Sequence, residues 1–174
     1  MHIRVIKYLT PVIIYIGAFN SFTVTGWQIW IPLMIAWGFI PLMELFIKPD
    51  PKNMSVAEEE LVKADRVYDI MLYLIVVLQF AALYMFLQSM RADDLSWVDT
   101  AGRIWVMGML CGTFGINVGH ELGHRVNKFE QTLAKMLLLT SLYMHFFIEH
   151  NKGHHKNVAT PKDPSSARYG EWVY

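Results

Sequence analysis

The chain has 174 residues, enough for one ordinary domain, and apolar side chains make up 54% of it. Its 15 Lys and Arg residues balance 15 Asp and Glu residues, so the total charge indicates no polyanionic partner. A single cysteine, Cys111, excludes an intrachain disulfide framework. The apolar residues gather in long runs, which is not typical of a soluble domain and favours a protein built against a membrane.

Four apolar runs predict membrane-spanning helices, at about residues 8–24, 27–47, 70–90 and 104–119. Each approaches the roughly 20 residues that cross about 30 Å of hydrocarbon, and the two shorter runs must tilt or include flanking residues. The linker at Thr25 and Gly26 is very short, so the first two runs predict a tight hairpin. No small-residue cleavage site follows the first run, which we therefore expect to be retained as an anchor.

The distribution of positive charge predicts how these helices are oriented. Of the 15 Lys and Arg residues, 13 precede the first run, lie between the second and third, or follow the fourth. Only Arg91 and Arg103 lie on the opposite side, beside three aspartates. By the positive-inside rule, both termini are expected in the cytoplasm.

Local signals refine two of these segments. Ser55 followed by Glu58 is a capping-box pattern, which predicts a short cytoplasmic helix before the third run. The fourth run carries glycines at small-xxx-small spacing, which either allow close helix packing or reflect the general frequency of glycine in membrane helices. These glycines are Gly108, Gly112, Gly115 and Gly119.

Two short clusters near the C-terminal end hold five of the seven histidines. The first spans residues 120–125 (HELGHR) and the second spans residues 149–156 (EHNKGHHK). His120 and His124 are four residues apart, as are His150 and His154, so on a helix each pair shares one face. Neutral imidazole is the commonest metal ligand in proteins, so both clusters are candidate metal sites.

A fifth apolar stretch, at about residues 132–148, separates the two clusters. A full crossing would place the clusters on opposite sides of the membrane and make a shared metal site impossible. We therefore expect this stretch to form an interfacial or re-entrant helix. Both histidine clusters then lie at the cytoplasmic face.

The first cluster alone leaves the chemistry open. His-Glu-x-x-His on a helix is the core of many zinc hydrolases, in which Glu121 would act as the general base. A catalytic zinc takes three protein ligands, so five imidazoles exceed its needs and suggest two metals. Imidazole suits iron, copper, zinc and nickel alike. A membrane metal binder or transporter is a third possibility, although these runs hold few polar residues.

The two clusters together resemble the histidine boxes of the integral-membrane non-haem di-iron alkane monooxygenases. The sequence segments at residues 145–148 (HFFI) and 158–164 (VATPKDP) fit that family too, and the similarity extends over most of the chain. The resemblance implies a bacterial inner-membrane enzyme with two non-haem irons. It also implies terminal hydroxylation of n-alkanes by O2, with electrons that pass from NADH through rubredoxin reductase and rubredoxin.

The resemblance also assigns residues. The family's iron ligands correspond to His120, His124, His150, His154 and His155, and Glu121, Glu149 and His145 become candidates for orienting those imidazoles. The family has a further histidine box and a histidine-bearing motif downstream, which this sequence does not contain. The resemblance therefore predicts an N-terminal fragment that is inactive alone and binds iron poorly.

Other residues could serve the substrate and the electron carrier. Trp30, Ala36, Trp37 and Phe39 on the second run are candidates for measuring alkane length, although aromatic residues in a span are more often ordinary packing. A basic surface could receive an acidic carrier such as rubredoxin or, equally, anionic lipid headgroups. Its residues are Lys128, Lys152, Lys156 and Arg168.

The sequence thus predicts an all-α, multi-pass transmembrane helical bundle that forms a single domain over residues 1–174. Its first candidate function is alkane 1-monooxygenase. The alternative from another reaction class is an intramembrane zinc metalloprotease that uses the His-Glu-x-x-His motif.

Overall fold

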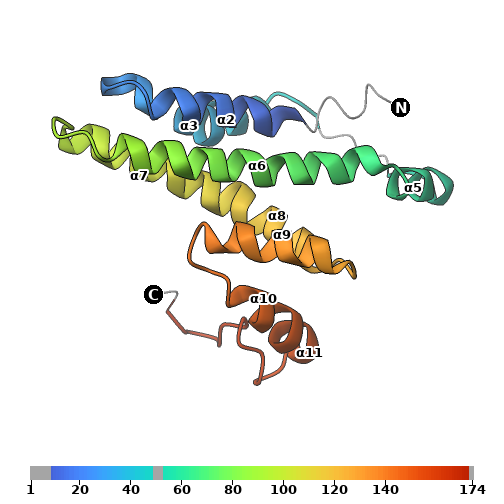
Figure 1. Cartoon of the computed structure of the whole chain (residues 1–174). Helices are drawn as coiled ribbons and strands as arrows, with labels where there is room; N and C mark the ends of the chain where they lie inside the picture. The colour runs from blue at the N-terminus through green and yellow to red at the C-terminus, as the bar shows by residue number, and fades with distance from the viewer. Residues whose placement is uncertain (1–8, 49–52, 173–174) are drawn as a thin grey trace.

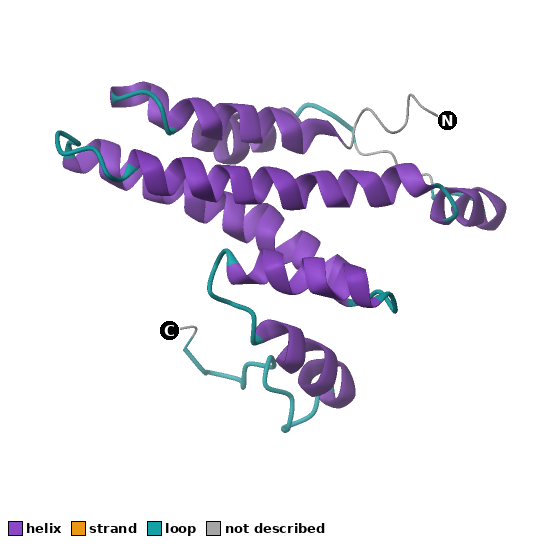
Figure 2. Cartoon of the chain, in the orientation of Figure 1, coloured by secondary structure: helices purple, strands orange, loops and turns teal. Residues whose placement is uncertain are grey.

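A computed structural model describes residues 9–48 and 53–172. The described residues form helices and connecting loops, and none of them lies in a strand (Figure 2). The predicted all-α class is therefore confirmed. Tyr8, where the first predicted span begins, and the basic residues Arg4, Lys7 and Lys52 lie outside the described residues.

The first two predicted spans form a helical hairpin. Helix α2 runs over Thr10–Ser21, and the next helical rod runs over Gly26–Glu44. The turn between them uses Gly26 at φ +77, a left-handed conformation that glycine adopts without steric cost. The rod changes its hydrogen-bonding pattern along its length, in the order η2 (Gly26–Trp30), α3 (Ile31–Met34), η3 (Ile35–Phe39) and α4 (Ile40–Glu44). Prolines at the starts of α3 and α4 lack the N–H that a continuous α-helix needs.

The third predicted span lies in a single long helix. Helix α5 (Val56–Lys63) precedes it, and the predicted capping box is confirmed, since the Ser55 side chain accepts from the Glu58 N–H and the Glu58 side chain accepts from the Ser55 N–H. Helix α6 then runs over Arg66–Ser89. The predicted span at 70–90 therefore begins four residues earlier and ends one residue earlier than expected.

The fourth predicted span lies in a helical rod that is longer than the predicted run. Helix α7 (Trp97–Leu110), the π-helical segment η4 (Cys111–Ile116) and α8 (Asn117–Gly123) follow one another without a break. The predicted run at 104–119 lies inside this rod. Its last segment, α8, carries the first histidine cluster.

The fifth apolar stretch is not the single helix over residues 132–148 that the sequence predicts. Helix α9 covers Lys128–Leu139, and the chain then turns back into α10 (Phe146–Ile148), η5 (Glu149–His154) and α11 (His155–Asn157). The turn closes because the Tyr143 N–H donates to the Leu138 carbonyl and the Leu142 N–H donates to the Leu139 carbonyl. This is the Schellman pattern, and it brings the second histidine cluster back beside α9 (Figure 1).

Leu142 occupies the position in this turn that usually requires glycine, with φ +56 and a side chain that is 84% exposed. We expect Leu142→Gly to stabilise the chain by about 1 kcal/mol, because it relieves the left-handed strain and removes few contacts. Unfolding in detergent, followed by circular dichroism, measures the effect. Met136→Gly inside α9 is the control and should lose about 1 kcal/mol. A Leu142→Gly variant that is less stable than the parent would refute the strain at this turn.

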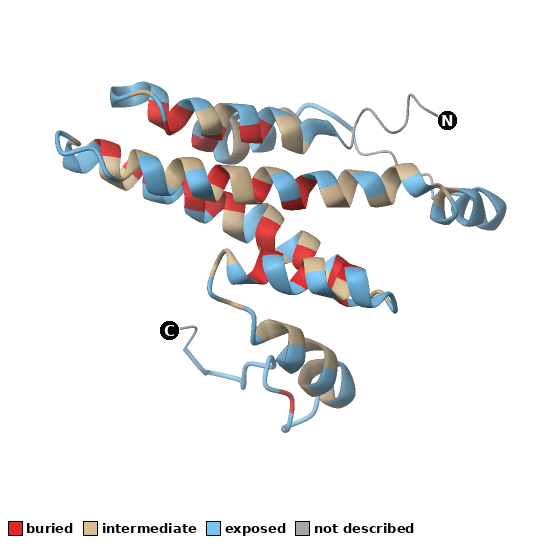
Figure 3. Cartoon of the chain, viewed as in Figure 1, coloured by how far each residue is buried: buried red, intermediate tan, exposed pale blue. Residues whose placement is uncertain are grey.

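The core lies where α2, α6 and α7 meet, with a second cluster between α6, α8 and α9 (Figure 3). Gly119 permits the second packing, because a Cβ there would lie 3.1 Å from the Leu138 side chain and 3.3 Å from the Ala134 carbonyl. Close packing therefore applies at Gly119, whereas a Cβ at Gly115 would make ordinary contacts of 3.4 Å with Gln79 and Thr140. A Cβ at Gly108 or Gly112 would meet nothing within 4 Å.

A buried polar contact joins the first core cluster to the end of α9. The Tyr15 hydroxyl donates to Gln79 Oε1 at 2.7 Å, and Gln79 Nε2 donates to Thr140 Oγ1 at 3.2 Å. Gln79 is fully buried in the middle of α6. Its amide therefore fixes how far α2, α6 and the end of α9 can slide past one another.

Side-chain contacts hold the two ends of the bundle. At one end, buried Arg103 donates to the carbonyls of Ser89 and Val24, and Asp99 accepts from the Gly26 N–H. The turn after α2 and the turn after α6 therefore lie at the same end. At the opposite end Arg125 pairs with Asp69 near the start of α6. Neighbouring rods thus run antiparallel, as alternating crossings require.

Two rods in the described part are long and apolar enough to cross a membrane, Gly26–Glu44 and α6. Large apolar side chains face outward on both, for example Met34 at 61% and Val77 at 66% exposure. Such exposure would be costly in water and is ordinary against lipid.

Candidate metal centre

Helix α8 presents the first pair of imidazoles on one face. His120 and His124 are one helical turn apart, and their Nε2 atoms lie 2.9 Å from each other. The rod cannot shift freely beneath them, because Gly119 sits directly against Leu138 of α9. The first cluster is therefore anchored on packed helices.

The second pair is not the one that the sequence predicts. Residues 149–154 form a π-helical turn, in which the hydrogen bonds join residues five apart. His150 and His155 consequently face the same way, with their Nε2 atoms 2.9 Å apart. His154, which an α-helix would pair with His150, has its ring 5.4 Å from that of His150 and lies at the side of the group.

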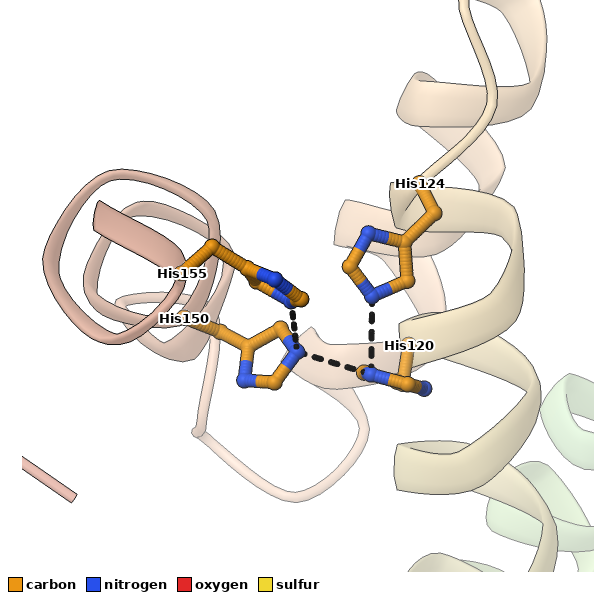
Figure 4. Close-up of side chains that lie close together, drawn as sticks. All are labelled: His120, His124, His150 and His155. Carbon is orange, nitrogen blue, oxygen red and sulfur yellow. Dashed lines mark hydrogen bonds between the residues drawn. The ribbon is translucent and has the colours of Figure 1, made fainter. Parts of the chain in front are cut away.

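The two pairs meet across the gap between α8 and the segment that contains η5 and α11 (Figure 4). His120 Nε2 lies 2.7 Å from His150 Nε2, and the ligand atoms of all four residues lie within 4.8 Å of one another. Phe146 stacks on the His150 ring, with centroids 4.7 Å apart and planes 19° from parallel. Four imidazoles from two distant stretches of sequence thus point at one spot.

Protons alone cannot satisfy this arrangement. Each Nε2 has either one N–H or one lone pair in the ring plane, so it makes one well-aligned hydrogen bond. His120 Nε2 and His150 Nε2 each have two imidazole neighbours, so if both outer contacts are hydrogen bonds, the shortest contact, between His120 and His150, has no partnered proton. A cation that receives a lone pair from each ring removes this conflict. Ligands about 2.0–2.1 Å from one metal lie roughly 3 Å apart, which fits these distances.

Electrostatics keep the lone pairs available. Removal from water, together with the neighbouring imidazoles, lowers the pKa of His150 to about 4. The same causes lower the pKa of His124. Both rings are therefore neutral at pH 7, which is the form that binds metal.

These pKa shifts predict how the stability of the metal-free chain depends on pH. Because the folded pKa of His150 lies below its unfolded value of about 6.5, the unfolded chain binds more protons between the two values. The histidine contribution is therefore complete above pH about 6.5 and is lost as the pH falls toward 4. Unfolding transitions across this range, measured in the presence of a chelator, should show the decline. His150→Gln should reduce it, and an equal decline in that variant would contradict the assignment.

A carboxylate that the sequence analysis did not select supports the fifth histidine. Asp163 follows α11 in a polar loop, yet it is only 6% exposed, and its two oxygens lie 2.9 and 3.0 Å from His154 Nδ1. Hydrogen bonds, the largest effect coming from Ser166, hold the pKa of Asp163 well below its usual range. The local sequence, Lys-Asp-Pro, is that of an ordinary turn and gives no sign of this role. The role of Asp163 becomes visible only in the contact between the loop and the helix.

The three residues that the sequence analysis predicts to orient the imidazoles do not contact them through hydrogen bonds in the described part of the chain. Glu121 Oε1 accepts from Arg125 Nη2 at 3.2 Å instead of from an imidazole. The His145 ring contacts Tyr143, with centroids 4.7 Å apart. In the part of the chain that the structure describes, no hydrogen bond joins the Glu149 or His145 side chain to an imidazole of the group. Their orienting roles stay predictions.

The part of the chain that holds the histidine boxes also matches a known family. Residues 95–174 match the fatty acid desaturase family. The chain is 35% identical to alkane 1-monooxygenase 1 of Alcanivorax borkumensis, over 99% of this chain and 43% of that protein. It is 38% identical to alkane 1-monooxygenase of Pseudomonas putida and 36% identical to that of Ectopseudomonas oleovorans, in each case over 86% of this chain and 38% of the relative. The chain is therefore similar to alkane 1-monooxygenases over most of its own length.

This similarity agrees with the resemblance drawn from the two boxes, and the histidine cluster is suited to binding metal. The chain spans less than half the length of the curated relatives that it matches. The zinc protease alternative is not favoured, because the relatives are monooxygenases. In addition, Glu121, its general base, is paired with Arg125.

Proposed function

We propose that this chain supplies histidine ligands to a non-haem di-iron centre that hydroxylates the terminal carbon of n-alkanes with O2. The observation that carries the proposal is the convergence of four Nε2 atoms from two boxes. His120, His124, His150 and His155 would hold metal directly, and His154 is the fifth candidate. Bound iron would supply O2 activation and oxidation of the C–H bond, which no acid or base side chain can perform.

The residues of this chain hold and shield that centre. Phe146 covers one face of His150, and Phe147 packs beneath α8, where a Cβ at Gly123 would lie 3.4 Å from its ring. Arg125 joins α8 to α6 through Asp69. These contacts fix the imidazoles before metal arrives, which lowers the cost of assembling the site.

The substrate proposal gains support from an apolar cavity of about 950 Å³. It lies between α2, the rod Gly26–Glu44 and η4, and Ala36, Trp37 and Phe39 are among its lining residues. Trp30 is absent from that lining and instead packs where Gly102 leaves room for it. A linear alkane that enters from lipid would find an apolar path there, and Ala36, Trp37 and Phe39 remain candidates for measuring its length.

Electrons are proposed to come from rubredoxin, reduced through an NADH-dependent reductase. Lys128, Lys152, Lys156 and Arg168 are all exposed in the half of the chain that bears the histidines. Docking of an acidic carrier to them should weaken as salt increases. An electron-transfer rate that does not change with salt would count against this surface.

The function is tested in a full-length protein that contains these residues, because the family resemblance predicts that residues 1–174 are inactive alone. It is expressed with rubredoxin and rubredoxin reductase in a bacterial host that does not oxidise alkanes, and a series of n-alkanes is supplied. We expect O2-dependent formation of 1-alkanols, detected by gas chromatography with mass spectrometry. A folded, iron-loaded protein that converts no alkane would refute the proposal.

The topology is proposed to be four crossings of the inner membrane, with the histidines at the cytoplasmic face. The antiparallel contacts at the two ends of the bundle support it. A fusion of alkaline phosphatase after Asp94 should therefore be active, and the same fusion after Lys128 should be inactive. Activity in the second fusion would contradict the orientation.

A further inference from the structure

We propose that Asp163 is a positioning residue that commits His154 to offering its Nε2 atom to the metal centre. This inference rests on the proposed metal site and adds a residue to it. The contact joins the second histidine box to a loop nine residues later. The side chain of Asp163 is fully buried, whereas that of His154 is 27% exposed.

Hydrogen-bond chemistry fixes the proton at this contact. Asp163 Oδ1 accepts from the Ser165 N–H at 2.9 Å, and Oδ2 accepts from the Ala159 N–H at 3.3 Å and from the Ser166 hydroxyl at 2.7 Å. Backbone N–H groups can only donate, and three donors around one carboxyl group stabilise its ionised form. His154 Nδ1 must then carry the proton that it shares with Asp163.

A proton on Nδ1 leaves the lone pair of a neutral imidazole on Nε2. In the group of four histidines it is likewise the Nε2 atoms that converge. The His154 ring lies 5.4 Å from the His150 ring and 5.6 Å from the His155 ring, centroid to centroid. Asp163 thus selects the tautomer in which His154 can join its neighbours as a ligand.

The loop is built to approach the helix closely. A Cβ at Gly153 would lie 3.0 Å from Cγ of Pro164, so glycine at this position lets the residue after Asp163 rest on the π-helical turn. Ala159 adopts a left-handed conformation, φ +59, and its N–H is one of the donors to Asp163. The carboxylate therefore holds both the strained loop and the imidazole.

The test uses the metal-free full chain in detergent with 15N-labelled histidine. Long-range 1H–15N spectra report the tautomer of each ring, and His154→Gln assigns the signal. We expect His154 to be protonated on Nδ1 in the parent and to move toward the other tautomer in Asp163→Ala. Ser166→Ala is the matched control, because it removes a hydrogen bond to the same carboxylate without touching His154, and it should keep the parent tautomer.

Metal affinity provides the second readout. Titration with Co²⁺ should show about 10–100-fold weaker binding in Asp163→Asn, the range measured when carboxylates behind metal-bound histidines are removed. The same substitution in a His154→Gln background should cause no further loss, since the effect passes through that imidazole. An unchanged His154 tautomer in Asp163→Ala, or an additive loss in the double variant, would overturn the inference. The tautomer is read without metal, so this result stands apart from whether the protein hydroxylates alkanes.

Discussion

His150→Gln is expected to lower iron loading strongly and to abolish alkane hydroxylation. His150 Nε2 has two imidazole neighbours, at 2.7 and 2.9 Å, so it is central to the group of four. The loss should exceed the roughly 10–100-fold effect of removing a supporting residue, because a ligand itself disappears. Iron content by mass spectrometry and 1-alkanol yield measure the two effects.

His145→Gln is the matched control for this variant. His145 lies five residues earlier, and its ring contacts Tyr143 and none of the four imidazoles that converge. Any loss in this variant should stay within the roughly 10–100-fold effect of an orienting residue, well below the loss in His150→Gln. If His150→Gln kept full iron and activity, or if both variants lost them equally, the four-imidazole site would be wrong.

Arg103→Met is expected to cause the largest loss of stability away from the histidines. Arg103 is 4% exposed, and its guanidinium donates to the carbonyls of Ser89 and Val24 at 2.6 and 2.9 Å. Removing it leaves two carbonyl acceptors unsatisfied, at about 1–3 kcal/mol each. The free energy of unfolding in detergent should therefore fall by about 2–6 kcal/mol.

Arg91→Met provides the comparison, because Arg91 is exposed and makes a single side-chain bond of 3.4 Å to Gln88. Its effect should stay within about 0.5 kcal/mol. Arg103→Met should reduce hydroxylation only in proportion to the folded fraction. Equal stability of the two variants would show that Arg103 does not hold the turns together.

Much of the fold could be predicted from local patterns. The apolar runs predict the helices, and Ser55 with Glu58 predicts the start of α5, since capping depends on residues three apart. The turn at residues 140–143 could not be predicted in this way. Neither Gly nor Pro marks it, and Leu142 adopts a conformation that a leucine rarely takes.

The sequence predicts which histidines form the site better than it predicts which of them lie next to each other. His120 and His124 meet as α-helical spacing requires. The partner of His150 is His155 instead of His154, because a π-helical turn shifts the repeat by one residue and composition carries no signal for such turns. Asp163 was missed for a different reason, because its role depends on tertiary contact between a loop and a helix.

X-ray absorption at the iron edge is the most direct test of the central claim, that the two histidine boxes form one metal site. On the iron-loaded protein, the spectrum should show the scattering pattern of several imidazoles in the first shell. Separate His120→Gln and His150→Gln variants should each lose part of that pattern, because these residues come from different boxes. A spectrum without imidazole scattering, or one that neither variant changes, would contradict the account.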